Sequence, residues 1–168
     1  MNSNTKKHYR ENVQMWIYNK GKFLIAEEST KNNLGTIYWK FPHGGVEKGE
    51  ELLDAVKREL KEELSILSFE VMAQAKYQHY FDWPLELQKK KGYHGQHQHY
   101  FLIYPKNINE IKFNPSEIDQ IKWLSFKQTI QQFTIPNQIE SAQKVWLEFK
   151  PIIEQKLKIK KRITIKND

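Results

Sequence analysis

The sequence predicts a layered α/β fold, because stretches with the pattern of strands alternate with stretches with the pattern of helices. Two further observations favour a single domain over residues 1–168. The length is within the usual range of one domain, and 39% of the residues are apolar, enough for a sizeable core. No internal repeat or long low-complexity linker divides the chain. We therefore expect a core over about 9–150 and a basic C-terminal extension over 151–168.

The first half of the chain contains two strands and one long helix. The strands are expected near 11–18 and 22–27, with a short turn at Asn19–Gly21 between them. A loop rich in Thr, Lys, Asn and Gly follows over 29–36. The segment from Glu50 to Leu64 has no Gly or Pro and is rich in strong helix formers, so it is expected to be helical. Glycine and turn residues before it are typical of a loop that leads into a helix.

The second half begins with strand-like stretches at 68–80, 96–104 and 120–124. Ser125 is a candidate cap for a short helix over 126–132. A final helix is expected after Pro136, where apolar residues recur at helical spacing.

The end of the chain is basic and admits several interpretations. Pro151 is expected to end or kink the final helix. Between Lys156 and Lys166, apolar and basic residues alternate. This tail is consistent with an edge strand, an RNA-contacting arm or a solvated terminus.

Composition excludes several classes of protein. The chain has no Cys, which rules out disulfides, thiolate metal sites and cysteine nucleophiles. No apolar run approaches a membrane span, and the N-terminus lacks the apolar region of a signal peptide, so a cytoplasmic location is expected. No DNA-binding motif is present. The net charge of +7 predicts that polyanionic substrates are attracted to the protein.

The predicted helix over 50–64 carries carboxylates beside its apolar face. At 100° per residue, the apolar side chains form one arc: Leu52, Leu53, Val56, Leu60 and Leu64. Glu59 and Glu63 lie at the edge of this arc, and Glu62 lies beside them. Like charges four residues apart cost about 0.2–0.5 kcal/mol, and partial burial costs more unless a cation intervenes. Such oxygen ligands suit Mg²⁺ or Mn²⁺, which also bridge to substrate phosphates.

The alternative is an ordinary surface helix with a solvated Glu/Lys face, which is the usual meaning of a charge run. Two observations favour the metal site. The carboxylates border the apolar arc instead of opposing it, and Gly44 and Gly45 lie in the loop before the helix. Because glycine permits close approach of the backbone, the carbonyl of Gly44 is a further candidate ligand.

The same residues form a recognisable pattern. Gly44, five residues, Glu50, seven residues and then Arg58-Glu59-Leu60-x-Glu62-Glu63-x-Ser65-Ile66 resembles the Nudix box. The box is the signature of hydrolases that split diphosphate linkages in nucleoside diphosphates joined to another group. Ser65 stands where the family has a glycine. The resemblance implies a mixed β-sheet between helices, an α/β/α sandwich.

Flanking motifs resemble the bacterial RNA pyrophosphohydrolases, which share their pattern with dinucleoside polyphosphate hydrolases. The matching segments cover roughly 9–150 and stand in the family's order: Tyr9-Arg10-x-Asn12-Val13, Trp39-Lys40-Phe41-Pro42-His43-Gly44-Gly45, Tyr80-Phe81-Asp82-Trp83-Pro84, Gly95-Gln96-x-Gln98-x-Tyr100-Phe101, and Pro115-Ser116-Glu117-Ile118-Asp119 followed by Trp123.

The resemblance implies a role for each acidic residue of the site. Glu59, Glu62 and Glu63 would bind divalent cations together with the Gly44 carbonyl. Glu117 matches a distant glutamate that helps to bind metal or to activate water. Either Glu62 or Glu117 would accept the proton of the attacking water. Arg58 and Glu50 are expected to support these ligands. Arg58 would pair with Glu50 or with a helix carboxylate and hold it in place.

Substrate contacts are implied for three other residues. Arg10 would contact the phosphates or the terminal base. Lys40 and His43 replace glutamines common beside the glycine pair, and Lys40 is a candidate phosphate ligand. Phe133 is either the aromatic that stacks on the first base or a core residue. Glu27 and Glu28 stand where the RNA enzymes tend to be basic, which weakens the attraction for a nucleic acid end.

Three functions are compatible with this pattern. The first is removal of pyrophosphate, or of successive phosphates, from RNA 5′-triphosphate ends, which leaves a 5′-monophosphate. The second is hydrolysis of a dinucleoside polyphosphate or another nucleotide by the same core. The third is a non-catalytic nucleotide sensor, which the intact carboxylate set argues against.

Histidines at 94, 97 and 99 raise the question of zinc. Alternation places His97 and His99 on one face of a strand and Gln96 and Gln98 on the other. No third ligand is apparent, so a polar strand that lines a nucleotide cleft is the favoured interpretation.

Overall fold

A computed structural model describes residues 8–29 and 37–166, with side chains described up to residue 159. Eight strands within these ranges form one mixed sheet. The central pair is parallel, β1 (Tyr9–Asn19) beside β7 (Gly95–Pro105), with Glu11 directly opposite His97. The remaining strand pairs are antiparallel: β2 (Lys22–Glu28) and β4 (His43–Gly45) on β1; β3 (Trp39–Lys40) and β8 (Ile118–Leu124) on β2; β5 (Phe69–Gln74) and β6 (His79–Asp82) on β7.

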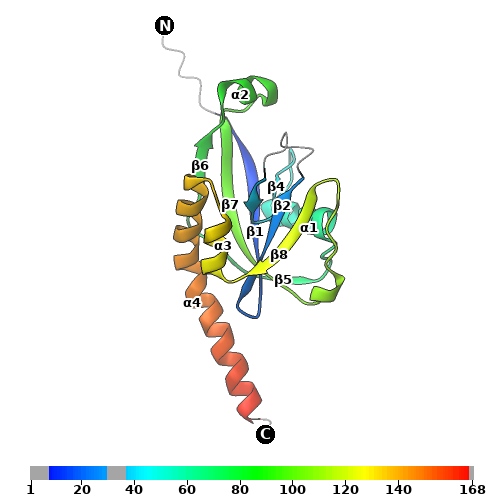
Figure 1. The fold of residues 1–168 in the computed structure, drawn as a ribbon, viewed down its shortest axis with the longest axis vertical. Coiled ribbons are helices and arrows are strands. Elements are labelled where there is room, and N and C mark those ends of the chain that lie inside the picture. The colour runs from blue at the N-terminus through cyan, green and yellow to red at the C-terminus, as the bar shows by residue number, and fades with distance from the viewer. Residues whose placement is uncertain (1–7, 30–36, 167–168) are drawn as a thin grey trace.

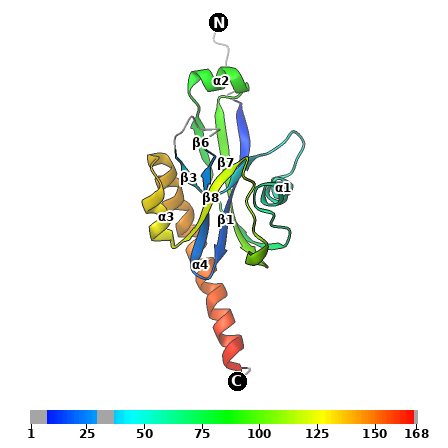
Figure 2. The same ribbon diagram turned by 45° about the vertical axis from the view of Figure 1, so that its right-hand side comes forward.

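Helices cover both faces of this sheet. Helix α1 (Leu52–Leu64) lies on one face, whereas α3 (Phe126–Gln132) and α4 (Pro136–Lys166) lie on the other (Figures 1 and 2). The short helix α2 (Leu85–Lys91) lies at the end of the sheet, between β6 and β7 in the chain. The predicted α/β/α sandwich is confirmed.

The two faces of the sheet bury different side chains. On the α1 side, the core is mainly aliphatic and includes Val13, Met15, Leu60 and Leu64. On the α3–α4 side it is rich in aromatic rings around Trp16, which stacks on Phe41 with ring centroids 4.1 Å apart. Strand alternation produces this division, because neighbouring residues of β1 point to opposite faces.

Most of the predicted elements are present, with differences at strand ends. The strands at 11–18, 22–27, 96–104 and 120–124 are confirmed with small extensions. The predicted strand over 68–80 is two strands, β5 and β6, which pair with different parts of β7. Helix α2 was not predicted, because none of its residues is buried and its sequence has no apolar periodicity. The loop prediction over 29–36 falls outside the described residues except at Ser29.

The capping prediction for α3 is confirmed in detail. The Ser125 side chain accepts a hydrogen bond from the backbone N–H of Gln128. The Gln128 side chain in turn accepts from the Ser125 backbone N–H at 3.0 Å, which completes a capping box.

The prediction that Pro151 ends or kinks the last helix is wrong in that α4 continues to Lys166. Pro151 cannot donate a hydrogen bond to the carbonyl of Leu147. Both residues are exposed, so water can supply the missing donor. The helical state of residues 156–166 also excludes the edge-strand interpretation of the tail. The last core residue described is Ile153, beyond the expected boundary at 150.

Candidate active site

Helix α1 places Glu59 directly against the loop that precedes it. Glu59 is buried, and its side chain fills the space beside Gly44. A Cβ atom added to Gly44 would lie 1.9 Å from the Glu59 carboxyl carbon. Glycine is therefore needed at position 44 because any side chain would displace this carboxylate.

Arg58 ties the start of the loop to the helix, as predicted. Its Nε and Nη2 atoms each donate to one oxygen of Glu50 at 2.9 Å. Its Nη1 donates to Glu59 at 2.6 Å, and Nη2 also donates to the carbonyl of Gly45 at 2.8 Å. The bidentate bond to Glu50 lowers the pKa of that carboxyl and raises the pKa of the Arg58 guanidinium further. One guanidinium thus orients Glu59 and fixes the glycine loop.

Glu63 shares its surroundings with several other carboxylates. Burial raises the pKa of Glu63 to about 8, and the negative charges of Glu59 and Glu117 add to the effect of burial, against the opposing charge of Lys40. Burial also raises the pKa of Glu59, although its bond to Arg58 opposes the shift. The structure therefore brings Glu59, Glu63 and Glu117 together, with Lys40 as the nearby cation.

The other two predicted acidic groups of this cluster are open to solvent. The Glu62 side chain is 59% exposed and lies 3.4 Å from Arg58 Nη1. Glu117 is exposed on the loop before β8, where its backbone carbonyl accepts a hydrogen bond from Ser29 at 2.9 Å. Both can contact water without movement of the core.

The donor set of this cluster fits a hard divalent cation. Four carboxylates offer only oxygen atoms, and the negative charges of Glu59 and Glu117 add to the effect of burial on the pKa of Glu63. A divalent ion would compensate that charge, and carboxylate and carbonyl oxygens are the ligands that Mg²⁺ and Mn²⁺ prefer. The residues present therefore suit the predicted ion.

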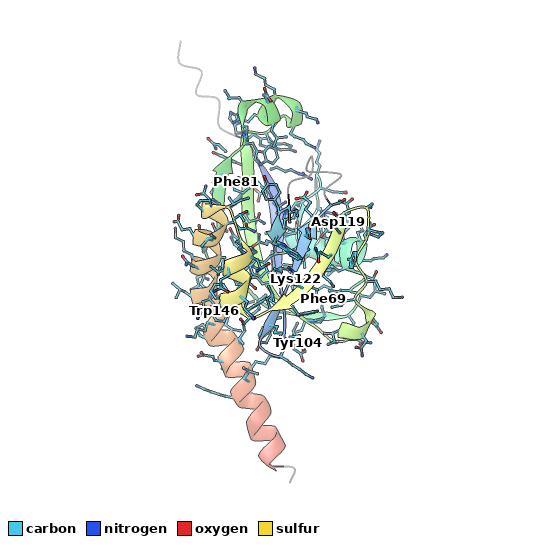
Figure 3. All side chains as sticks on the ribbon, in the orientation of Figure 1. Phe69, Phe81, Tyr104, Asp119, Lys122 and Trp146 are labelled. Carbon is cyan, nitrogen blue, oxygen red and sulfur yellow. The ribbon has the colours of Figure 1, made fainter. Side chains whose placement is uncertain are left out.

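A cavity of about 740 Å³ opens on the opposite face of the sheet. Its walls come from β3, β6, β7, the end of α3 and the start of α4, with aromatic residues at Tyr38, Trp39, Phe41, Phe81, Trp83, Tyr100 and Phe133. Figure 3 shows Phe81 above these helices and Trp146 of α4 beside α3, where it stacks on Phe126 at 4.5 Å. The volume is that of a small-ligand site.

The cavity and the carboxylate cluster meet at Lys40. Lys40 lines the cavity and forms an ion pair with Glu28 at 2.5 Å. The charge of Lys40 lowers the pKa of Glu63, and the charge of Glu28 raises it. His43 lies beside them, half-buried with its Nδ1 atom shielded from solvent; desolvation holds its pKa well below the usual range, reinforced by the positive charges of Lys40 and Arg10. A neutral imidazole and a paired ammonium therefore stand between the two parts of the site.

Arg10 lies at a second hollow. Its guanidinium packs on Gly45, where an added Cβ would lie 2.0 Å from Nη2. It lines a hollow of about 360 Å³ with Glu47, Lys48, Lys91 and Tyr93, so three cations and one carboxylate surround this space. This is a surface suited to phosphate.

Of the two roles weighed from sequence for Phe133, the core position is confirmed, and stacking on a base stays a prediction. It is buried and packs edge-on against Phe41 at 5.4 Å, and it also lines the cavity. It is a core residue with one face on the site.

Several residues of the site were not found from sequence. Tyr38 and His79 line the cavity, but isolated aromatic residues in loops and edge strands carry no pattern; Trp83 also lines it and lies in a flanking motif, which assigned it no role. The strand prediction was more useful: Gln96 and Gln98 do line the cavity, as an alternating polar strand should.

The histidine pair lies on the other face, away from the cavity lining. His97 and His99 both contact Glu11, at 2.9 and 2.5 Å. Glu11 is thus the third polar group that was not apparent in sequence.

Within 8–29 and 37–166, no helix combines the length and the apolar character needed to cross a lipid bilayer.

Comparisons with known proteins place this geometry in context. A family model described as "NUDIX domain" matches residues 8–147. The chain is 34% identical over 156 residues to an RNA pyrophosphohydrolase of Bartonella henselae, which covers 81% of this chain and 84% of the relative. It is also 34% identical over 134 residues to an RNA pyrophosphohydrolase of Campylobacter jejuni. That match covers 75% of this chain and 83% of the relative.

A solved structure supports the fold. The dihydroneopterin triphosphate pyrophosphohydrolase of E. coli matches with a TM-score of 0.63 and 18% identity, over 84% of this chain and 99% of that one. At this identity the likeness concerns the arrangement of strands and helices.

Proposed function

This chain belongs to the Nudix hydrolase family, and we propose that it acts on RNA as a pyrophosphohydrolase. In the proposed reaction it removes pyrophosphate from a 5′-triphosphate end and leaves a 5′-monophosphate. The observation that carries this proposal is the 34% identity, over most of both chains, to two bacterial proteins named for that activity. The geometry of the site supports the roles proposed below for its residues.

Nudix hydrolases use divalent metals, and we propose Mg²⁺, with Mn²⁺ as a substitute, for this chain. Its ligands would be Glu59, Glu62, Glu63 and Glu117 with the carbonyl of Gly44. When bound, the ion neutralises phosphate charge and lowers the pKa of the attacking water. The position of Glu63 supports this assignment, because its carboxyl is close enough to Glu59 and Glu117 for their negative charges to raise its pKa further than burial alone does.

The protein's own groups would then orient the reaction. Arg58 holds the Glu59 carboxylate at 2.6 Å, so this ligand is preorganised. Glu62 and Glu117 are the solvent-exposed carboxylates of the cluster, and one of them accepts the proton of the attacking water. Glu59 and Glu63 are less suited to this step because they are more buried.

The aromatic cavity would hold the first nucleoside of the RNA. Its rings, including Trp39, Phe81 and Phe133, offer stacking surfaces that tolerate any base. Lys40, where the cavity meets the carboxylates, would contact the triphosphate once it exchanges Glu28 for phosphate. The hollow formed by Arg10, Lys48 and Lys91 would contact a phosphate of the chain.

The proposal is tested by Mg²⁺-dependent turnover on two substrates, 5′-triphosphorylated RNA and diadenosine tetraphosphate. The blank is Glu62→Gln, and the matched control is Glu51→Gln, an exposed glutamate whose side chain makes no cap bond. We expect pyrophosphate release from RNA with the higher kcat/KM. A higher kcat/KM on the dinucleotide would assign the chain to nucleotide hydrolysis, and activity on neither would favour a sensor.

A further inference from the structure

Three side chains that the proposed reaction does not use meet on the α1 side of the sheet. Glu11 extends from β1, and His97 and His99 extend from β7, the strand that runs parallel to it. One ligand atom of each lies within 4.8 Å of the others. Two imidazoles and one carboxylate at this separation form a set that transition metals bind in proteins.

The carboxylate of Glu11 contacts both rings. Its Oε1 is 2.9 Å from Nδ1 of His97, and its Oε2 is 2.5 Å from Nε2 of His99. Both histidines are buried, whereas the Glu11 side chain is 46% exposed. The nitrogen atoms are thus held by the fold, and the oxygen ligand can adjust and admit an ion from solvent.

Two residues other than Glu11 and His99 fix the orientation of the His97 ring. Its Nε2 lies 2.7 Å from Oε1 of Gln78, and its ring stacks on Tyr80 with centroids 3.8 Å apart. Because an amide oxygen accepts, Nε2 carries a proton. In neutral His97 the lone pair of Nδ1 then faces the Glu11 carboxylate, so these two acceptors, 2.9 Å apart, need either a second proton on the ring or a metal cation between them.

His99 has one polar atom that the described residues leave unused. Its Nδ1 is buried, and among residues 8–29 and 37–166 it has no hydrogen-bond partner. A metal on Nε2 requires the tautomer with the proton on Nδ1. Adopting that tautomer breaks no other hydrogen bond of the ring.

We propose that Glu11, His97 and His99 bind one divalent transition-metal ion of the Zn²⁺ type. Imidazole nitrogen favours such ions over Mg²⁺, which prefers the oxygen-only cluster at α1. The site is therefore chemically distinct from the proposed catalytic one. The ion joins the start of β1 to β7, next to the bond that Val46 N–H donates to the Glu11 carbonyl at 2.9 Å.

The full chain tests this proposal after removal of metals with a chelator. Saturating Mg²⁺ fills the oxygen cluster, and Co²⁺ is titrated as the probe by calorimetry and by its visible absorption. We expect one Co²⁺ per chain. His97→Gln and His99→Gln should each weaken binding at least ~100-fold, and Gln78→Ala about 10-fold, as for a group that orients a ligand. His8→Gln, an exposed histidine outside the group, should bind like the wild type.

A second readout is thermal. Zn²⁺ should raise the Tm of the wild type and of His8→Gln, because it binds only the folded state, and should not raise the Tm of His97→Gln. If the histidine variants fail to fold, Glu11→Gln carries the test, since this residue is half-exposed. Wild-type Co²⁺ affinity in Glu11→Gln, or no Co²⁺ binding under saturating Mg²⁺, overturns the proposal. So does loss of the Co²⁺ signal in Glu63→Gln alone, which would assign the ion to the glutamates.

Discussion

The two faces of the sheet differ in their side chains and in the functions proposed for them. On the α1 face, carboxylates from one helix and one loop lie close together, and Arg58 holds one of them, Glu59. On the α3–α4 face, mainly aromatic and amide side chains from several elements form a cavity whose lining also includes the Glu28–Lys40 ion pair. Lys40 lies where the two meet. We therefore expect changes on the first face to alter the rate and changes on the second face to alter substrate affinity.

The strongest way to test this division is to remove a proposed proton acceptor. Glu62→Gln or Glu117→Gln should reduce kcat by at least ~100-fold, because the lost group acts in the transition state. The KM for RNA should change little. Steady-state kinetics of both variants beside Glu51→Gln decides which carboxylate is the base. If the kcat of neither variant falls by more than a few-fold, another group accepts the proton.

A substitution on the cavity face should have the opposite effect and alter KM more than kcat. Phe81→Ala removes a ring from the cavity wall and should raise the KM for RNA about 10-fold, since stacking on one base is worth ~1–3 kcal/mol. The kcat should stay near that of the wild type. Phe69→Ala is the matched control, a partly buried ring that packs against the aliphatic core (Figure 3). An equal rise of KM in the control would attribute the effect to loss of packing.

The charge on the α1 face also predicts a pH effect on stability. Without metal, folded Glu63 keeps its proton up to a pKa of about 8, whereas the unfolded chain loses it near 4.5. The folded state binds more protons between these values, so its stability falls as pH rises through that window.

Glu63→Gln cannot titrate, and in chelator it should raise Tm at pH 8 by at least ~3 °C more than at pH 5. Thermal denaturation at both pH values checks this, with Glu51→Gln expected to shift neither. Mg²⁺ should raise the Tm of the wild type at pH 8 more than that of the variant. The same Tm change at both pH values would mean that Glu63 is ionised in the folded protein.

The smallest expected effect concerns the end of α1. Ser65 caps this helix with φ 56° and ψ 23°, a left-handed conformation that favours glycine. Ser65→Gly should stabilise the protein by up to ~1 kcal/mol and leave kcat unchanged. Urea denaturation measures the gain. Destabilisation would mean that the Ser65 side chain makes a compensating interaction.

The α1 face was largely predictable from sequence, because its geometry is local. Glu50, Arg58 and Glu59 lie within one loop and helix, so their spacing specifies which of them meet. The approach of Glu59 to Gly44 also follows from this motif. Helix α3 was predictable for the same reason, since its cap and its first turn are adjacent in the chain.

The cavity and the group of Glu11, His97 and His99 were not predictable from such patterns. Glu11 lies 86 residues before His97, and only the parallel register of β1 and β7 brings them together. The cavity likewise needs the placement of α4 on the sheet. Helix α4 continues past Pro151 at an exposed turn, although the sequence pattern alone favours an end or a kink there.

The division between the two faces is tested most directly by single-turnover kinetics on 5′-triphosphorylated RNA. The two variants to compare are Glu62→Gln and Phe81→Ala, each with separate determination of the RNA Kd and of the rate of the chemical step. We expect the first to lose rate at unchanged Kd and the second to lose affinity at unchanged rate. If both variants lost rate and affinity in the same proportion, the separation of chemistry from recognition would be contradicted.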